Sequence, residues 1–256
     1  MSRSGRMLRL ALIGVIGGFF SGLFGVGGGI IIVPLLILLL HYDQRLAAGT
    51  SLTAILPTAV AGTIAYGLQG SVDWIAGLCL GAGAIVGSLI GTWLLHRTHL
   101  LALRWMFIAF LLIVAVRMFF FVPERGADLD LDPLLVAALV GTGLVTGILS
   151  GLLGVGGGVI VVPVLMLLFG ASDLVAKGTS LLMMIPTSIT GTISNLRRRN
   201  SDVRGALVIG GLAIPASFGG AALAAVVPPL LGSILFALLL LYSAGQLAWN
   251  ALRNNR

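Results

Sequence analysis

Long apolar runs separated by short polar stretches follow one another along almost the whole chain. The runs have the lengths of helices that cross a bilayer or enter it part of the way. We predict an all-α polytopic membrane protein with about five apolar segments in each half. The segments are expected at about 8–24, 28–40, 47–67, 72–95 and 100–121, and again at about 133–152, 157–169, 178–195, 204–226 and 229–250.

An internal repeat relates the two halves of the sequence. Residues 21–29 match residues 150–158 with a single difference, so the shift between the halves is 129 residues. The same shift pairs Pro34 with Pro163, Gly49-Thr-Ser-Leu52 with Gly178-Thr-Ser-Leu181, Pro57-Thr58 with Pro186-Thr187, and Asp73 with Asp202. We therefore expect a first transmembrane repeat (1–122), an acidic linker (123–132) and a second transmembrane repeat (133–256). Because the first apolar segment has a counterpart, we interpret it as a retained helix rather than a cleaved signal peptide.

One segment in each half is short and follows a glycine-rich stretch. Residues 28–40 would form a helix of about 20 Å, whereas the hydrocarbon core of a bilayer is roughly 30 Å thick. We expect each glycine-rich stretch to join two segments either as a re-entrant pair or as a broken helix.

The placement of arginine predicts opposite orientations for the two halves. The connection between the third and fourth segments has no basic residue in the first half, but contains Arg197–Arg199 and Arg204 in the second. The next connection reverses this bias, with Arg97 and Arg104 in the first half only. By the positive-inside rule, equivalent connections lie on opposite sides of the membrane and both termini are cytoplasmic. Such inverted-topology repeats are typical of secondary transporters.

Composition excludes several classes of protein. Charged residues make up 9% of the chain, hydrophobic residues 58%, and the mean hydropathy is +1.13, whereas a soluble domain has roughly 25% charged residues. These values exclude a soluble enzyme and a disordered protein. The net charge of +7 comes from arginines between apolar runs rather than from one basic face, so we expect no nucleic-acid binding.

Candidate catalytic chemistry is missing from the sequence. No nucleophile and base, paired carboxylates or spaced metal ligands are found, and Cys79 is the single cysteine. We expect no enzyme activity, no catalytic residue, no metal and no cofactor. No ionisable residue is expected at the middle of a span, and Lys177 and Arg45 are expected at the rims, where they would recruit an anion.

The glycine-rich breaks are the strongest candidates for a binding site. They are formed by Gly25, Gly27, Gly28 and Gly29 in the first half and by Gly154, Gly156, Gly157 and Gly158 in the second. Broken backbone inside a bilayer is tolerated against protein or a wet cavity. Its free amides and the start of the next helix attract anions. The alternative is close helix packing at the repeat interface.

Polar residues after the breaks are secondary candidates for the same site. They are Thr50, Ser51, Pro57 and Thr58 in the first half and Thr179, Ser180, Pro186 and Thr187 in the second. Their hydroxyls could coordinate anionic oxygens, and the prolines free carbonyl groups. Alternatively, the hydroxyls bond back to their own helices.

Nearly the whole chain resembles the TauE/SafE sulfite-exporter family. The resemblance is in the doubled motif: Gly-x-Gly-Gly-Gly, an apolar run with a proline, then Gly-Thr-Ser-Leu and Pro-Thr. The resemblance implies a bacterial cytoplasmic-membrane transporter that exports sulfite, sulfonates or related small sulfur-containing anions. The leading hypothesis is a secondary carrier with alternating access, whose partners are a small anion and the lipid bilayer. A passive anion channel, a lipid-handling protein and a structural membrane subunit remain as alternatives. The sequence does not indicate an oligomeric state.

Overall fold

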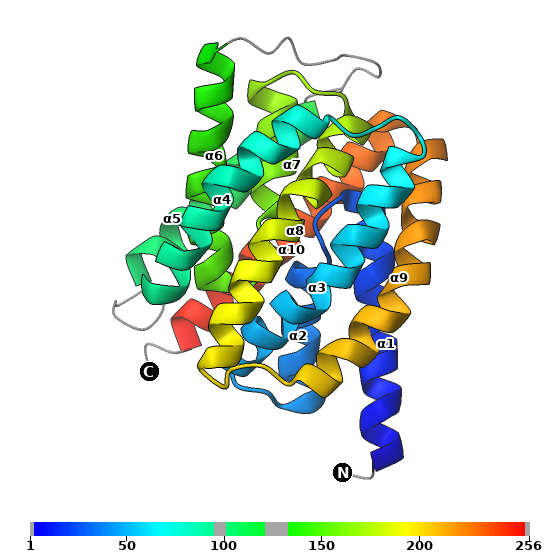
Figure 1. Cartoon of the computed structure of the whole chain (residues 1–256), viewed down its shortest axis with the longest axis vertical. Coiled ribbons are helices and arrows are strands. Elements are labelled where there is room, and N and C mark those ends of the chain that lie inside the picture. The colour runs from blue at the N-terminus through cyan, green and yellow to red at the C-terminus, as the bar shows by residue number, and fades with distance from the viewer. Residues whose placement is uncertain (1–2, 95–100, 121–132, 254–256) are drawn as a thin grey trace.

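The computed structural model describes residues 3–94, 101–120 and 133–253, and this part of the chain is built from ten helices (Figure 1). The first half contains α1 (Arg3–Phe24), α2 (Gly29–Leu40), α3 (Gln44–Gly67), α4 (Trp74–Leu94) and α5 (Leu101–Phe120). The second contains α6 (Pro133–Leu153), α7 (Gly158–Leu168), α8 (Asp173–Arg197), α9 (Val203–Val226) and α10 (Pro229–Arg253). The all-helical prediction is confirmed. The acidic linker predicted at 123–132 lies outside the described residues.

Glycine forms the sharp turns between the first two helices of each half. Gly25, Gly27 and Gly28 have φ angles of 68°, 71° and 75°, and the equivalent glycines before α7 have φ angles of 71–85°. Glycine adopts this left-handed conformation without the steric cost that other residues meet. After the turn, α2 runs back towards the end of the molecule at which α1 begins (Figure 1). Helices α1 and α2 therefore form a hairpin whose second arm is the shorter one.

The contacts between the halves repeat with the 129-residue shift of the sequence. Glycines of α1 lie against α9, and the equivalent glycines of α6 lie against α4. Gly18 meets Ala213 and Gly147 meets Ala84, while Gly22 meets Ser217 and Gly151 meets Ser88. At each glycine, a Cβ atom would collide with backbone of the facing helix. The small residues therefore let these helix backbones touch, as in close-packed membrane helices.

Helices α3 and α8 lie at the centre, where each packs against the other half. Gly62 of α3 contacts Leu181 of α8, and Gly191 of α8 contacts Leu52 of α3. The main cluster of buried apolar side chains contains residues from both halves. The two repeats therefore share one core.

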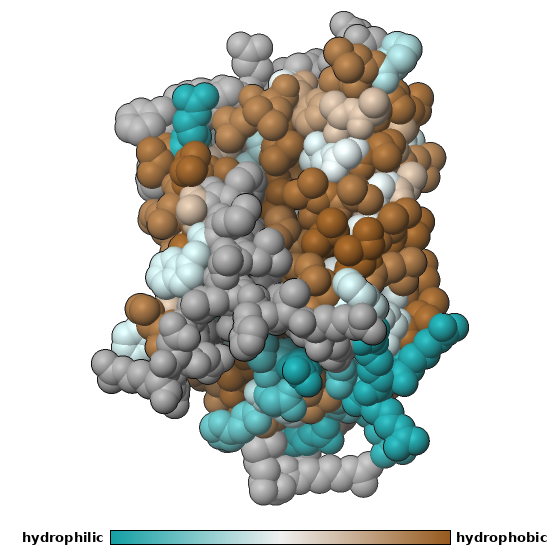
Figure 2. Space-filling view, turned by 90° about the vertical axis from the view of Figure 1, so that its left-hand side faces the viewer, coloured by the Kyte–Doolittle hydropathy of each residue, from teal (hydrophilic) through white to brown (hydrophobic). Residues whose placement is uncertain are grey.

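The outer surface is apolar over much of its height, as Figure 2 shows for one face, with hydrophilic side chains gathered at the lower end. Six helices of the described part are long and apolar enough to cross a membrane, and α2 and α7 are shorter apolar helices. A surface of this kind is suited to lipid rather than water.

Basic residues are concentrated at one end of the molecule. The connections α2–α3 and α8–α9 lie at the lower end in Figure 1, as does the start of α1. Arg6 and Arg9 of α1, Arg45 of α3 and Arg197–Arg199 after α8 belong to this end. The described connections at the opposite end, 68–73, 169–172 and 227–228, contain no lysine or arginine.

Two glycines of α6 provide a test of the close packing between halves. A Cβ at Gly147 would strike the backbone of Ala84, whereas a Cβ at Gly141 meets nothing within 4 Å. We expect Gly147→Ala to destabilise the protein by about 1–3 kcal/mol through overpacking. Gly141→Ala should instead stabilise it by about 0.5–1 kcal/mol, because alanine favours the helix. Thermal unfolding of the two variants in detergent measures both changes, and equal effects would contradict the packing described here.

Candidate functional site

The two glycine-rich breaks meet at the interface between the halves. Gly29 lies against the backbone of Val155, and its equivalent Gly158 lies against the backbone of Val26. Val26 and Val155 are themselves equivalent residues of the two halves. Side chains of Ile55 and Met184 are close to both breaks. Residues that are 129 positions apart in the sequence thus come together at one place.

Each break contains a run of backbone amides that lack an acceptor. The N–H groups of Gly25 and Gly154 still donate to Ser21 and Ser150, at 2.8 Å each. Regular bonding resumes where Ile31 and Ile160 donate to Gly28 and Gly157, at 3.0 Å each. Between these points, the N–H groups of residues 26–30 and 155–159 have no acceptor in the described part of the chain.

All ten of these residues are buried. A buried N–H without a partner costs about 1–3 kcal/mol, so folded proteins rarely leave one unpaired. Positive φ angles and helix starts direct such groups together into concave anion-binding arrangements. The breaks therefore present donors for a negatively charged ligand.

Ser51 and Ser180 lie on the helix faces that contact the breaks. On α3, Ala48 contacts Gly154 and Ile55 contacts Gly156, and Ser51 lies between them at helical spacing. Because residues three and four apart share a helix face, Ser51 faces the second break. Its hydroxyl is fully buried and has no hydrogen-bond partner among the described residues.

Ser180 has the equivalent place opposite the first break. Lys177 contacts Gly25 and Met184 contacts Gly27, with Ser180 between them on α8. This hydroxyl is also fully buried, and the described part of the chain offers it no hydrogen-bond partner. Each break is therefore completed by a serine of the other half. Ser21 and Ser150, in the turn before each break, also have buried hydroxyls without a partner in the described structure. They begin the repeated motif but were not among the residues predicted for the site.

Thr50 and Thr179 form hydrogen bonds between the halves. The Thr50 Oγ1 accepts the amide N–H of Asp202 at 3.0 Å, and the Thr179 Oγ1 accepts that of Asp73 at 2.9 Å. Asp202 and Asp73 directly precede α9 and α4. The two threonines therefore fix the start of a helix in the opposite repeat.

The Pro-Thr residues lie further along α3 and α8. Thr58 and Thr187 donate to carbonyl groups of their own helices, at 2.9 Å and 3.0 Å. These hydroxyl protons are thus used within the helix, as the alternative interpretation held. Pro57 packs against Gly210 and Pro186 against Gly81, so both prolines contact the other repeat.

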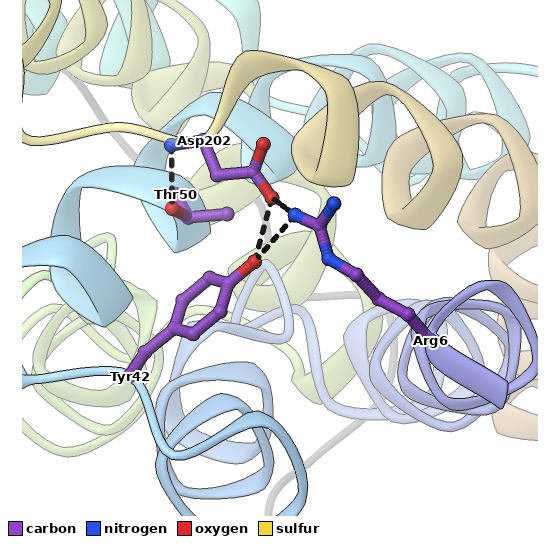
Figure 3. Close-up of polar contacts among 4 residues, drawn as sticks. All are labelled: Arg6, Tyr42, Thr50 and Asp202. Carbon is purple, nitrogen blue, oxygen red and sulfur yellow. Dashed lines mark hydrogen bonds and ion pairs between the residues drawn. The ribbon is translucent and has the colours of Figure 1, made fainter. Parts of the chain in front are cut away.

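A polar cluster joins four chain segments at the end where α1 begins (Figure 3). We call it the Asp202 cluster, and it consists of Arg6, Tyr42, Thr50 and Asp202. Arg6 donates to the Asp202 Oδ2 at 2.6 Å and to the Tyr42 Oη at 3.0 Å. Tyr42 also donates to the Asp202 Oδ2 at 2.6 Å. Burial raises the pKa of the Tyr42 phenol above its ordinary value, so Tyr42 remains a donor at neutral pH.

Lys177 is not at a rim, and this expectation is wrong. Helix α8 begins at Asp173, five residues before the predicted start, and Lys177 lies inside it with 5% of its surface exposed. Its Nζ is 3.6 Å from the Oδ2 of Asp173, which is also buried. Arg45, by contrast, is exposed as expected. No group of three or more His, Cys, Asp or Glu side chains that could hold a metal occurs among the described residues.

These features define a multi-pass membrane protein with a buried polar site between two repeated halves. The family model for the sulfite exporter TauE/SafE matches residues 2–118 and 138–256. The chain belongs to this family.

Similar proteins from bacteria and an archaeon are named probable membrane transporter proteins. YunE of Bacillus subtilis is 30% identical over 210 residues, which cover 73% of this chain and 77% of the relative. A protein of Xylella fastidiosa is 30% identical over 202 residues, covering 76% and 77%. MJ0441 of Methanocaldococcus jannaschii is 28% identical over 202 residues, covering 73% and 71%. No solved structure matches the chain.

The hydrogen bonds between Thr50 and Asp202 and between Thr179 and Asp73 give a prediction for stability. Thr50→Val and Thr179→Val should each destabilise the protein by about 1 kcal/mol, because a partly buried amide loses its acceptor. Thr146→Val is the matched control, since the buried Thr146 hydroxyl bonds to the carbonyl of Thr142 in its own helix at 2.7 Å. Thermal unfolding in detergent measures the changes, and Thr50→Ser and Thr179→Ser should restore the stability. Unchanged stability with valine at positions 50 and 179 would refute the role of these hydrogen bonds.

Proposed function

We propose that the protein is a secondary transporter for sulfite, sulfonates or related small sulfur-containing anions, with the anion bound between the two breaks. The observation that carries the proposal is the ten backbone amides on buried residues that have no acceptor in the described part of the chain, next to helix faces that bear the buried hydroxyls of Ser51 and Ser180. An oxyanion accepts several hydrogen bonds at once and carries the charge that a helix start favours. The named family supplies the substrate class.

The two halves act as an inverted-topology repeat in this proposal. The support is the set of equivalent contacts between halves, and the opposite directions of α1 and α6 in Figure 1. Rocking of one half against the other would expose the central site to each side in turn, as in other inverted-repeat carriers. The serine that completes each break comes from the other half, so this movement would also change the site.

We further propose that the protein lies in the bacterial cytoplasmic membrane with both termini in the cytoplasm. The support is the concentration of arginine at the end where α1 begins. This end corresponds to the cytoplasmic side by the positive-inside rule. Export would then load the anion at the arginine-rich end.

Counterflow in proteoliposomes tests whether the protein is a carrier. Vesicles filled with unlabelled sulfite should accumulate external labelled sulfite, because a carrier exchanges bound substrate across the membrane. Sulfate, thiosulfate and methanesulfonate are the competitors that rank substrates. Downhill flux without counterflow would show a channel instead, and folded protein without sulfite flux would remove sulfite as substrate.

Ser51 and Ser180 allow the location of the site to be tested without disturbing the breaks. We expect Ser51→Ala and Ser180→Ala each to weaken sulfite binding by about 10- to 150-fold, since a hydrogen bond to a charged group is worth about 1.5–3 kcal/mol. Ser243→Ala is the control, because the buried Ser243 hydroxyl bonds to Leu239 within α10 at 2.7 Å. Calorimetric titration in detergent measures the affinities. Unchanged binding in both site variants would place the anion elsewhere.

A further inference from the structure

One apolar side chain from each central helix lies between the two glycine-rich breaks. A Cβ atom at Gly27 of the first break would meet the side chains of Met184 and Ile55. A Cβ atom at Gly156 of the second break would meet the same two side chains. Ile55 of α3 and Met184 of α8 are equivalent residues of the two halves. This central pair therefore lies where the two repeats meet.

Glycine in the breaks makes room for the central pair. The Met184 methyl group is the nearest neighbour at both Gly27 and Gly156, and it occupies the space that a side chain there would need. Ile55 also lies beside Gly29, and the Met184 sulfur lies beside the equivalent Gly158. Neither member of the pair has exposed surface. Apolar atoms therefore fill the space between the amides of one break and those of the other.

The two members of the pair differ in stiffness although their places are equivalent. Isoleucine branches at Cβ, which leaves it one strongly preferred χ1 rotamer in a helix. Methionine is unbranched, has three rotatable bonds and adapts to irregular spaces. Met184 can therefore move its methyl group out of the centre by side-chain rotation, whereas Ile55 is held more firmly by its helix.

The central pair lies one helical turn beyond the serines of the proposed site. Ile55 follows Ser51 by four residues, and Met184 follows Ser180 by four. Residues at this spacing share a helix face, so an anion held by a break and its serine would lie against the pair. In channels, apolar constrictions stop water and ions until the constriction opens.

We propose that Met184 is a movable apolar gate between the breaks, that Ile55 is the wall against which it closes, and that the pair limits the size of the transported anion. This inference rests on the proposed function, in which the anion binds at the breaks. The anion enters the centre when the Met184 side chain swings aside. A larger organic group on the sulfur needs more of the space that the pair fills, so wild type favours sulfite and methanesulfonate over propanesulfonate.

Anion size tests the gate directly. Uptake of labelled sulfite into sulfite-filled proteoliposomes is measured with methanesulfonate and propanesulfonate as competitors. In Met184→Ala, propanesulfonate should gain at least about tenfold relative to methanesulfonate, because each methylene that an apolar site accommodates is worth roughly 10- to 200-fold. Met118→Ala is the matched control, since Met118 is also buried but belongs to α5, which forms no part of the site.

Stiffness of the gate is tested at nearly constant volume. Met184→Ile gives the second half the residue of the first, and such apolar exchanges are well tolerated, so it should fold. Sulfite exchange should slow by about tenfold, because the branched side chain does not swing aside readily. Adding Ile55→Met should restore fast exchange, since the mobile side chain then comes from the opposite helix. Met118→Ile is the control for the same chemical change.

Thermal unfolding in detergent establishes that each variant is folded. Wild-type size preference in folded Met184→Ala would overturn the proposal, and wild-type exchange by Met184→Ile would do the same. Either result would leave sulfite transport, and with it the proposed function, intact. If Met184→Ala does not fold, Met184→Ile and the double variant decide the question. Absence of sulfite exchange by wild type would instead remove the proposed function, and this inference with it.

Discussion

The need to pair backbone amides in an apolar interior is the constraint on which this structure depends. Water cannot solvate an N–H group inside a bilayer, so a helix break there must supply another partner. Two breaks meet at the centre of the protein, and in each the amides of five consecutive buried residues have no acceptor among the residues that the structure describes. A cost of this size persists in a folded protein when a ligand offsets it. The breaks are therefore where the proposed anion would contribute most to the fold.

Close packing of the helices holds the breaks together. Glycines of α1 and α6 let those helices contact the backbones of α9 and α4. Thr50 and Thr179 then fix the starts of α9 and α4 through hydrogen bonds between halves. Each repeat is thus held by the other, and neither break has its complete set of neighbours without both. The duplication accordingly brings the two breaks into one shared interior.

The sequence predicted the helices and the breaks well because both depend on local properties. Apolar runs gave the helix positions within a few residues, and glycine alone readily adopts the positive φ angles that the turns need. The start of α8 was missed, because Asp173 and Lys177 interrupt the apolar run although both are buried. The partner of Thr50 could not be predicted either. Asp202 lies 152 residues away, and no local pattern indicates which amide a buried hydroxyl will accept.

Unequal residues at equivalent positions make the two ends of the protein energetically different. Leu135 and Ala171 of the second half correspond to Arg6 and Tyr42 of the first, so Asp73 has no equivalent of the Asp202 cluster. In a carrier with alternating access, opening one end breaks the Thr179–Asp73 hydrogen bond, and opening the other breaks the Thr50–Asp202 bond.

The second movement also separates Arg6 from Asp202. Because the Arg6 side chain is 45% exposed, this ion pair contributes about 1 kcal/mol or less. Such a difference changes the ratio of two conformations by about fivefold. In the proposed carrier, two identical halves would populate the two open states equally, and these few substitutions would give it a preferred resting side.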